Sequence, residues 1–273
     1  MKKILAISFI LIDILLAFSQ ETEKKHPILS DRFMFNTSIY SSLQSIKLRV
    51  DSSDSNPIID FNKSFNLNNN EILFSFNFKW RYGKKWSLSS DYFSLKNGNE
   101  WQLEREINWG DVTFKTGSNV RVRVGLDMYR VFVGRTLSKG LKHEFGIGMG
   151  VHIPYIWAFI EGDAYVNEEK FIFENKSVSV IVPLPNLGFW YYYSPTPKWG
   201  FTANIDWFSL SYKNFSSKVM NIGPGVHYQV FKHFGVGLSY RYFKFTASID
   251  RKYWNGKYNM IFQGPLFSIS GNF

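Results

Sequence analysis

Cysteine is absent from the 273-residue sequence, which excludes both a disulfide framework and the lipid-modified cysteine of a lipoprotein. Histidine is scarce, with five residues in the chain. None of them stands at the i, i+2 or i, i+4 spacing of a metal-binding pair, so the sequence shows no metal-site motif. The glycines at 146, 148 and 150 alternate with apolar residues as in a strand, so they do not form a phosphate-binding loop. We therefore expect no metal ion and no cofactor.

Long apolar runs are also missing, since after residue 20 none approaches the ~18 residues of a membrane-spanning helix. If the chain crosses a membrane, it must do so as closed β-structure, because lipid offers no partners to unpaired backbone groups. Aromatic residues nevertheless make up 19% of the chain, and they are spread among polar residues. This composition suits a barrel wall whose two faces meet different solvents.

The first residues have the pattern of an export signal. Two lysines precede an apolar stretch from Ile4 to Ala17, and the small residues Ala17 and Ser19 stand where a signal peptidase reads the chain. We expect residues 1–19 to be a signal peptide and residues 20–32 to be a periplasmic N-terminal segment. Export removes the chain from nucleic acid, so the net charge of +10 indicates anionic lipid head groups as partners.

The clearest strand signal lies between residues 72 and 82. Polar residues, Lys79 and Arg81 among them, alternate there with apolar ones, and this period of two predicts a strand with one apolar face. Lipid would cover that face in a barrel, whereas a soluble sheet would need a second sheet. The apolar positions are Ile72, Phe74, Phe76, Phe78, Trp80 and Tyr82.

The same unit recurs as a hairpin whose short basic turn is flanked by aromatic rings, at 82–86, 193–199 and 231–234. The opposite connections are longer and polar, as the surface loops of outer-membrane barrels are. We predict an all-β, closed antiparallel, up-and-down transmembrane barrel over residues 33–273, with about ten strands and with eight or twelve as alternatives. The expected strands are 33–48, 71–82, 86–96, 119–136, 143–157, 177–193, 199–212, 219–231, 234–248 and 258–273. The expected loops are 51–70, 97–119, 159–176, 213–218 and 249–257.

Aromatic rings fall at both ends of the expected strands, where an amphipathic ring meets a membrane interface. The expected interface residues are Trp80, Tyr82, Trp86, Tyr193, Trp199, Trp207, Phe234 and Tyr242.

The C-terminal strand alternates Phe267, Ile269, Gly271 and Phe273 on one face. This ending resembles that of outer-membrane barrels, which finish on an aromatic residue recognised by the barrel-assembly machinery; Phe273 matches, while Gly271 stands where an aromatic is usual. As an architecture the mature chain resembles OmpA-like and OmpW-like barrels. Residues 105–111 and the segment from Tyr258 through Pro265 also look like a group of small outer-membrane barrels without assigned activity. The resemblance implies the outer membrane of a Gram-negative bacterium, with outer-membrane lipid and lipopolysaccharide around the chain.

Placing the apolar faces outward sends a mixture of charges into the lumen. We expect these charges to pair with one another and close a narrow lumen, as in small barrels generally. Gly146, Gly148 and Gly150 leave room there for a ligand or water path beside His152 or for incoming arginine side chains, or they permit tight curvature of the strand. The expected lumen residues are Lys79, Arg81, Asp91, Arg121, Arg123, Asp127, Glu144, His152, Asp206, His227, Gln229 and Arg241.

The resulting hypothesis is a barrel with a structural or surface-interaction role and no catalysis. One alternative is a narrow pore for small solutes. Another is a lipid-active enzyme, which would need His152 or His227 as base with Ser239 or Thr202 as nucleophile, although no local motif joins them. The candidate orienting acids are Asp127, Glu144 and Asp206.

Two expectations concern residues outside the strands. His26 is expected to lie exposed in the linker that follows the leader. Trp101, Trp109 and Trp254, in long polar loops, are expected either to bind a surface partner or to pack those loops together.

Overall fold

The computed structural model describes residues 25–50, 58–109, 112–166, 169–181, 183–213, 215–251 and 254–273. The expected signal peptide, residues 1–19, lies outside this part of the chain. Strands dominate, and the two described helices are the short α2 (Pro27–Ser30) and α3 (Phe61–Ser64). No described helix has the length and apolar character needed to cross a membrane.

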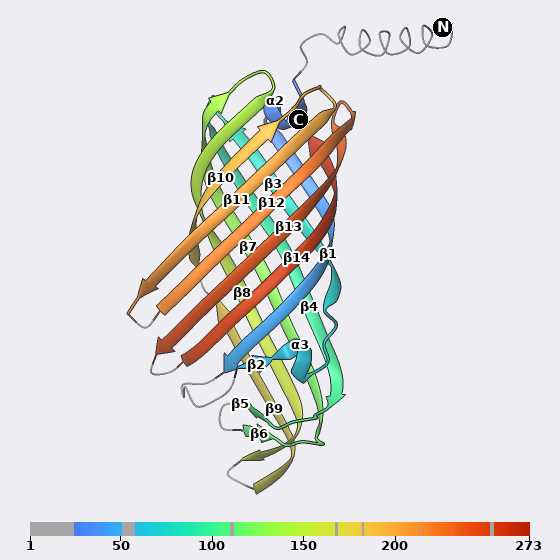
Figure 1. Cartoon of the computed structure of the whole chain (residues 1–273), viewed down its shortest axis with the longest axis vertical. Helices are drawn as coiled ribbons and strands as arrows, with labels where there is room; N and C mark the ends of the chain where they lie inside the picture. The colour runs from blue at the N-terminus through green and yellow to red at the C-terminus, as the bar shows by residue number, and fades with distance from the viewer. Residues whose placement is uncertain are drawn as a thin grey trace, which may run out of the picture.

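A closed ring of strands forms the body of the molecule (Figure 1). Every pairing is antiparallel, and the ring closes where the first strand pairs with the last, from Met34 opposite Asn272 to Val50 opposite Gly256. The predicted all-β, up-and-down barrel of about ten strands is therefore confirmed. Among the described residues the ten ring strands are, in order, β1 (Phe33–Val50), β3 (Asn70–Tyr82), β4 (Trp86–Gln102), β7 (Asn119–Lys139), β8 (His143–Val166), β10 (Leu184–Tyr193), β11 (Trp199–Tyr212), β12 (Phe215–Phe231), β13 (Phe234–Arg251) and β14 (Trp254–Asn272).

The two rims of the barrel differ. At one rim, the short-turn rim, strands are joined by tight turns such as Gly83–Lys85, and α2 and the C-terminus lie there (Figure 1). At the other, the long-loop rim, α3 and the short strands β2 (Ile59–Asp60), β5 (Ile107–Trp109) and β6 (Val112–Phe114) are found. α2 thus lies at the rim of the barrel that has the short turns.

Several predicted loops are wrong, because the strands continue through them. β8 and β9 (Glu169–Ile181) remain paired through most of the expected loop 159–176. β11 and β12 stay paired up to Tyr212 opposite Phe215, and β13 and β14 stay paired up to Arg251 opposite Trp254. The barrel wall thus extends well beyond its apolar outer band.

The apolar face changes sides along the strands. Near the short-turn rim of β7, Val131 and Val133 are exposed on the outer face, whereas near the long-loop rim Val122 and Val124 are buried inside. A strand in lipid needs an apolar outer face, but a strand that continues into water needs the reverse. The inside of the long-loop half is therefore filled by a continuous set of buried apolar side chains, here called the apolar core, which includes Phe245, Met260 and Phe262.

The long loops pack onto this core rather than standing free. Phe61 of α3 lies 6.0 Å from the ring of Trp109, and Trp109 is buried. Trp101 is partly buried against the same core. Trp101 and Trp109 therefore pack the long loops together, which was one of the two expectations for the loop tryptophans. The Trp254 side chain lies outside the described part.

Candidate functional site: the lumen network and its N-terminal plug

Most of the expected lumen residues do point inward. The cavity near the short-turn rim is lined by Lys79, Asp91, Asp206, His227 and Arg241. The residues of the expected set that lie inside the barrel are Lys79, Arg81, Asp91, Glu144, His152, Asp206, His227, Gln229 and Arg241.

The placement of Arg121, Arg123 and Asp127 in the lumen is wrong. All three lie on the outer face of β7, where Arg121 pairs with Glu100 at 2.7 Å and with Glu161 at 2.6 Å. The cause is the change of apolar face along β7: odd-numbered residues face outward throughout, but they are apolar only in the short-turn half. For the same reason the sequence did not identify Arg130, which faces the lumen and lines its cavity.

Arg130 joins opposite walls of the barrel. Its guanidinium donates to Asp91 of β4 at 2.8 Å and to Asp206 of β11 at 2.6 Å. Asn186 and Asn221 donate to the two oxygens of Asp206 at 3.0 and 2.9 Å. Charge-assisted bonds of this length fix the side chains of five strands relative to one another. We call these residues the Arg130 layer.

His152 borders the Arg130 layer without completing a catalytic arrangement. Its Nε2 atom lies 4.0 Å from Asp206, too far for a hydrogen bond, and its Nδ1 atom has no hydrogen-bond partner. Within the described residues, neither Ser239 nor Thr202 donates a hydrogen bond to a histidine. The nucleophile, base and orienting acid of the enzyme alternative are therefore not joined in this arrangement.

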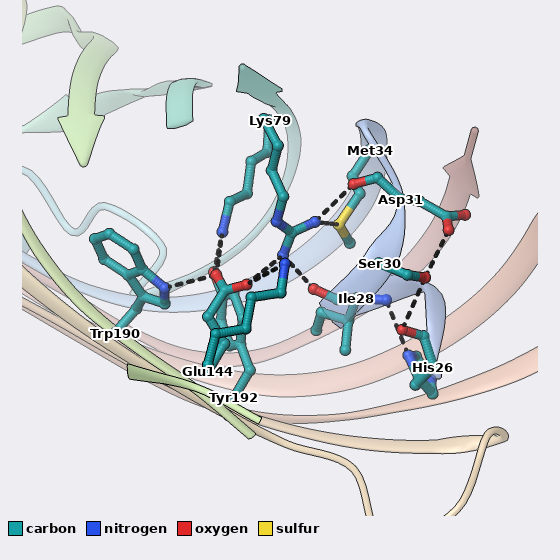
Figure 2. Close-up of polar contacts among 11 residues, drawn as sticks. His26, Ile28, Ser30, Asp31, Met34, Lys79, Glu144, Trp190 and Tyr192 are labelled. Atoms are coloured by element: carbon teal, nitrogen blue, oxygen red, sulfur yellow. Dashed lines mark hydrogen bonds and ion pairs between the residues drawn. The ribbon is translucent and has the colours of Figure 1, made fainter. Parts of the chain in front are cut away.

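A second cluster lies closer to the short-turn rim, around Glu144. This carboxylate is 1% exposed and accepts a hydrogen bond from Trp190 Nε1 at 3.0 Å. Lys79 and Arg81 approach it to 3.6 and 3.4 Å, and Lys139 to 3.5 Å. Figure 2 shows Lys79 and Trp190 converging on Glu144. One buried carboxylate thus holds three cations in place.

Arg81 connects this cluster to α2. Its guanidinium donates to the carbonyl oxygens of Ile28 and Asp31, the latter at 2.8 Å. Ile28 and Leu29 are buried, and they pack with Met34 of β1. Residues 26–31, here called the N-terminal plug, therefore lie in the short-turn mouth of the barrel (Figure 2).

The expectation that His26 is exposed is wrong. Its side chain is 3% exposed, and its Nδ1 accepts a hydrogen bond from the Ile28 backbone at 3.0 Å. Burial lowers the pKa of His26 to about 4, and the nearby His227 contributes to the lowering. No pattern in the sequence separates a histidine docked in a barrel mouth from one in a linker, because the docking surface comes from distant strands.

The glycines of β8 face an aromatic ring and the backbone of β7. A β-carbon on Gly146 would lie 2.1 Å from Trp190, whereas one on Gly150 would lie 2.4 Å from the backbone oxygen of Val131 and 3.0 Å from atoms of Phe132. No arginine is among these nearest atoms, so the expected arginine side chains do not fill this space. Without a side chain at Gly146, the Trp190 ring lies where its Nε1 donates to Glu144.

A polar cavity of about 190 Å³ remains between the N-terminal plug and the apolar core. Ile28 of the plug and Arg130 both line it. Serine and asparagine side chains supply much of its remaining wall, among them Ser38, Ser75, Ser268, Asn36 and Asn221.

The expected interface aromatics lie on the outer face of the barrel. Trp86, Tyr193 and Trp199 are exposed beside the short turns, and Trp207 is exposed further along β11. The complete expected set on this face is Trp80, Tyr82, Trp86, Tyr193, Trp199, Trp207, Phe234 and Tyr242.

Comparisons with solved structures support the same architecture. The outer-membrane protease OmpT from Escherichia coli is similar with a TM-score of 0.58 and 11% sequence identity, covering 93% of this chain and 99% of that one. The toluene transporter TodX of Pseudomonas putida scores 0.35 at 9% identity, covering 90% and 91% of the two chains. Ail, the attachment invasion locus protein of Yersinia pestis, scores 0.33 at 8% identity, covering 88% and 99%.

No protein-family model and no curated protein matches the chain. At such low identity the likeness to OmpT concerns the fold alone, and the lower scores carry no argument. Together with the closed ring and its apolar outer band, it shows that the chain has the fold of a small outer-membrane β-barrel, the fold that spans the outer membrane of Gram-negative bacteria.

Proposed function

We propose that this chain is an integral outer-membrane barrel with a structural or surface-interaction role and that its lumen is closed to solutes. The observation that carries the proposal is the apolar core, because Phe245, Met260 and Phe262 are each 0% exposed inside the long-loop half of the wall. The N-terminal plug and the Glu144 cluster obstruct the other end. Close packing of buried side chains supports a lumen without a path for water or ions.

Conductance of the refolded protein in a planar bilayer tests this proposal. A folded barrel, recognised by its heat-modifiable gel mobility, is expected to insert without discrete current steps. Discrete steps from folded protein would contradict the closed lumen and favour the narrow-pore alternative.

The proposal includes no catalytic role. One similar structure bears the name of a protease, but the likeness is one of fold. In this chain His152 is 2% exposed and has no hydroxyl bonded to it. Replacing His152 with Ala is expected to leave the composition of the outer-membrane lipids unchanged. A change in those lipids, with the variant barrel still folded, would favour the lipid-active enzyme.

Outer-leaflet lipid and lipopolysaccharide are the proposed partners. On β13, Tyr242 of the outer face is followed two positions later by Lys244. Lys218 of β12 faces outward at a corresponding depth near the long-loop rim, and so does Lys47 of β1, which also pairs with Asp60 at 3.4 Å. Cations just beyond an apolar band with an aromatic border are suited to the phosphate groups of anionic lipid.

Phe273 is the proposed assembly signal for the barrel-assembly machinery. Its ring is exposed and stacks on His233 at 5.1 Å, while its backbone pairs with Phe33 at the seam of the ring. The ring thus remains accessible on the folded barrel.

A surface ligand at the long loops is also part of the proposal, in keeping with the structured elements α3, β5 and β6 at that rim.

A further inference from the structure

Arg241 differs from the other cations of the lumen. Arg130 has two carboxylate partners, and Lys79 shares Glu144 with Arg81. Within the described ranges no carboxylate lies at ion-pairing distance from Arg241, whose guanidinium carbon is 5.7 Å from the ring of Phe93. Phe93 belongs to the apolar core, so Arg241 stands at the boundary between that core and the polar cavity.

Serine hydroxyls face the same cavity from three adjacent strands. Ser38 of β1 is opposite Ser75 of β3 on one side and Ser268 of β14 on the other. All three line the cavity, and we call them the serine shelf. Gly237 of β13 is opposite Ser268, and the Ser268 hydroxyl and the His227 ring lie over it. Each hydroxyl of the shelf offers a hydrogen-bond donor.

Among the cations of the cavity wall, Arg241 has the fewest close anions. Lys79 pairs with Glu144 behind the lining, and Arg130 pairs with both carboxylates of the lining, Asp91 and Asp206. An unpaired charge is costly within low-dielectric walls, and a bound anion would offset that cost. Guanidinium groups bind planar carboxylate and tetrahedral phosphate oxygens through two parallel hydrogen bonds.

We propose that the lumen binds a small soluble oxyanion, a phosphate or a carboxylate, between the guanidinium of Arg241 and the serine shelf. The volume of about 190 Å³ admits such an anion. A lipid head group is less suitable, because the closed wall separates the cavity from the acyl chains. The site is on the periplasmic side of the apolar core and is covered by the N-terminal plug. The proposed anion site is independent of the proposed function, because it could bind an anion whether or not the barrel conducts ions.

The test uses the mature chain refolded in detergent with radiolabelled inorganic phosphate present, so that closure by the plug does not prevent entry. Equilibrium dialysis at constant ionic strength is expected to show saturable retention of one phosphate per chain. Arg241→Gln is expected to weaken retention by about tenfold or more, because a charged hydrogen-bonding partner is lost. The matched control Arg121→Gln removes an arginine from the outer face and is expected to leave retention unchanged. Acetate competing with phosphate would extend the site to carboxylates.

Retention that is absent in the native chain, or equal in Arg241→Gln, would overturn the proposal and leave a hydrated lumen only. If Arg241→Gln does not fold, Ser38→Ala combined with Ser268→Ala keeps the arginine and removes two shelf hydroxyls. That double variant is expected to lose affinity several-fold, and unchanged affinity would overturn the role of the shelf. Channel recordings of the same samples report on conduction separately.

Discussion

The imidazole of His26 lies directly over Gly200 of β11, where a β-carbon would come within 3.1 Å of the ring. The absence of a side chain at Gly200 thus provides the seat for the first residue of the N-terminal plug. The plug and a strand about 170 positions away are therefore matched in shape.

Replacing Gly200 with Val is expected to displace the plug, because the added methyl groups occupy the position of the His26 ring. The chain has no cysteine, so a single Leu29→Cys substitution reports on plug docking. Leu29 is 0% exposed, and its cysteine should react slowly with a maleimide in the native background and rapidly with Gly200→Val. Gly223→Val, at a position with open space around it, is the control. Equal maleimide reactivity in the native and Gly200→Val backgrounds would contradict the role of Gly200 in docking the plug.

Plug docking is expected to weaken in acid. The pKa of His26 is about 4 when the plug is docked, against an ordinary value of 6.5, so the docked state favours the neutral ring. The free energy of docking is therefore most favourable above pH 6.5. It becomes less favourable by up to about 3 kcal/mol as the pH falls from 6.5 towards 4. A spin label on Leu29→Cys should become mobile over this range. The same response in a His26→Asn background would assign the effect to another group, such as the neighbouring His227.

Removing the Glu144 carboxylate is expected to destabilise the barrel strongly. Glu144→Gln leaves Lys79 and Arg81 buried without their anion, a change that typically costs about 3–5 kcal/mol. Glu100→Gln breaks an exposed pair with Arg121 and should cost less than about 1 kcal/mol. Urea unfolding in detergent, followed by tryptophan fluorescence, measures both free energies. Similar costs for the two variants would show that the Glu144 cluster does not hold the short-turn end together.

Lipopolysaccharide is expected to stabilise the folded barrel through its phosphates. Lys218→Glu combined with Lys244→Glu places negative charge near the long-loop rim and should abolish the rise in melting temperature that lipopolysaccharide gives. Lys198→Glu, at the short-turn rim, is the control and should retain the rise. Dephosphorylated lipopolysaccharide should give little stabilisation of the native chain. Stabilisation that survives the double substitution would exclude these lysines as the contact.

Particular strands show how far the sequence could predict the fold. The alternation in β3 predicted a strand over 71–82, and the structure has Asn70–Tyr82. β14 was expected at 258–273 and covers Trp254–Asn272. These predictions are confirmed because a strand facing lipid on one side and a polar lumen on the other carries its orientation in its own residues.

β7 shows where that reasoning ends. Its residues alternate throughout, but along the chain the apolar set moves from even positions, up to Met128, to odd positions, from Tyr129 onward. Odd positions face outward in both halves, so Arg121 and Arg123 face outward while Arg130 faces the lumen. Periodicity identifies two faces but cannot tell whether the apolar one meets lipid or a core. That depends on how far the strand extends beyond the membrane.

The sequence by itself determined the strands, their approximate number and the apolar outer band, because these properties are local and repeat every two residues. Only the tertiary structure decided which charges meet, that the apolar core fills one half of the lumen and that the N-terminal plug fills the mouth of the other. Those features depend on contacts such as Arg130 with Asp206, 76 residues apart, and closure of the ring brings such residues together. Burial of His26 beside Gly200 has the same origin, since neither residue alone specifies the other.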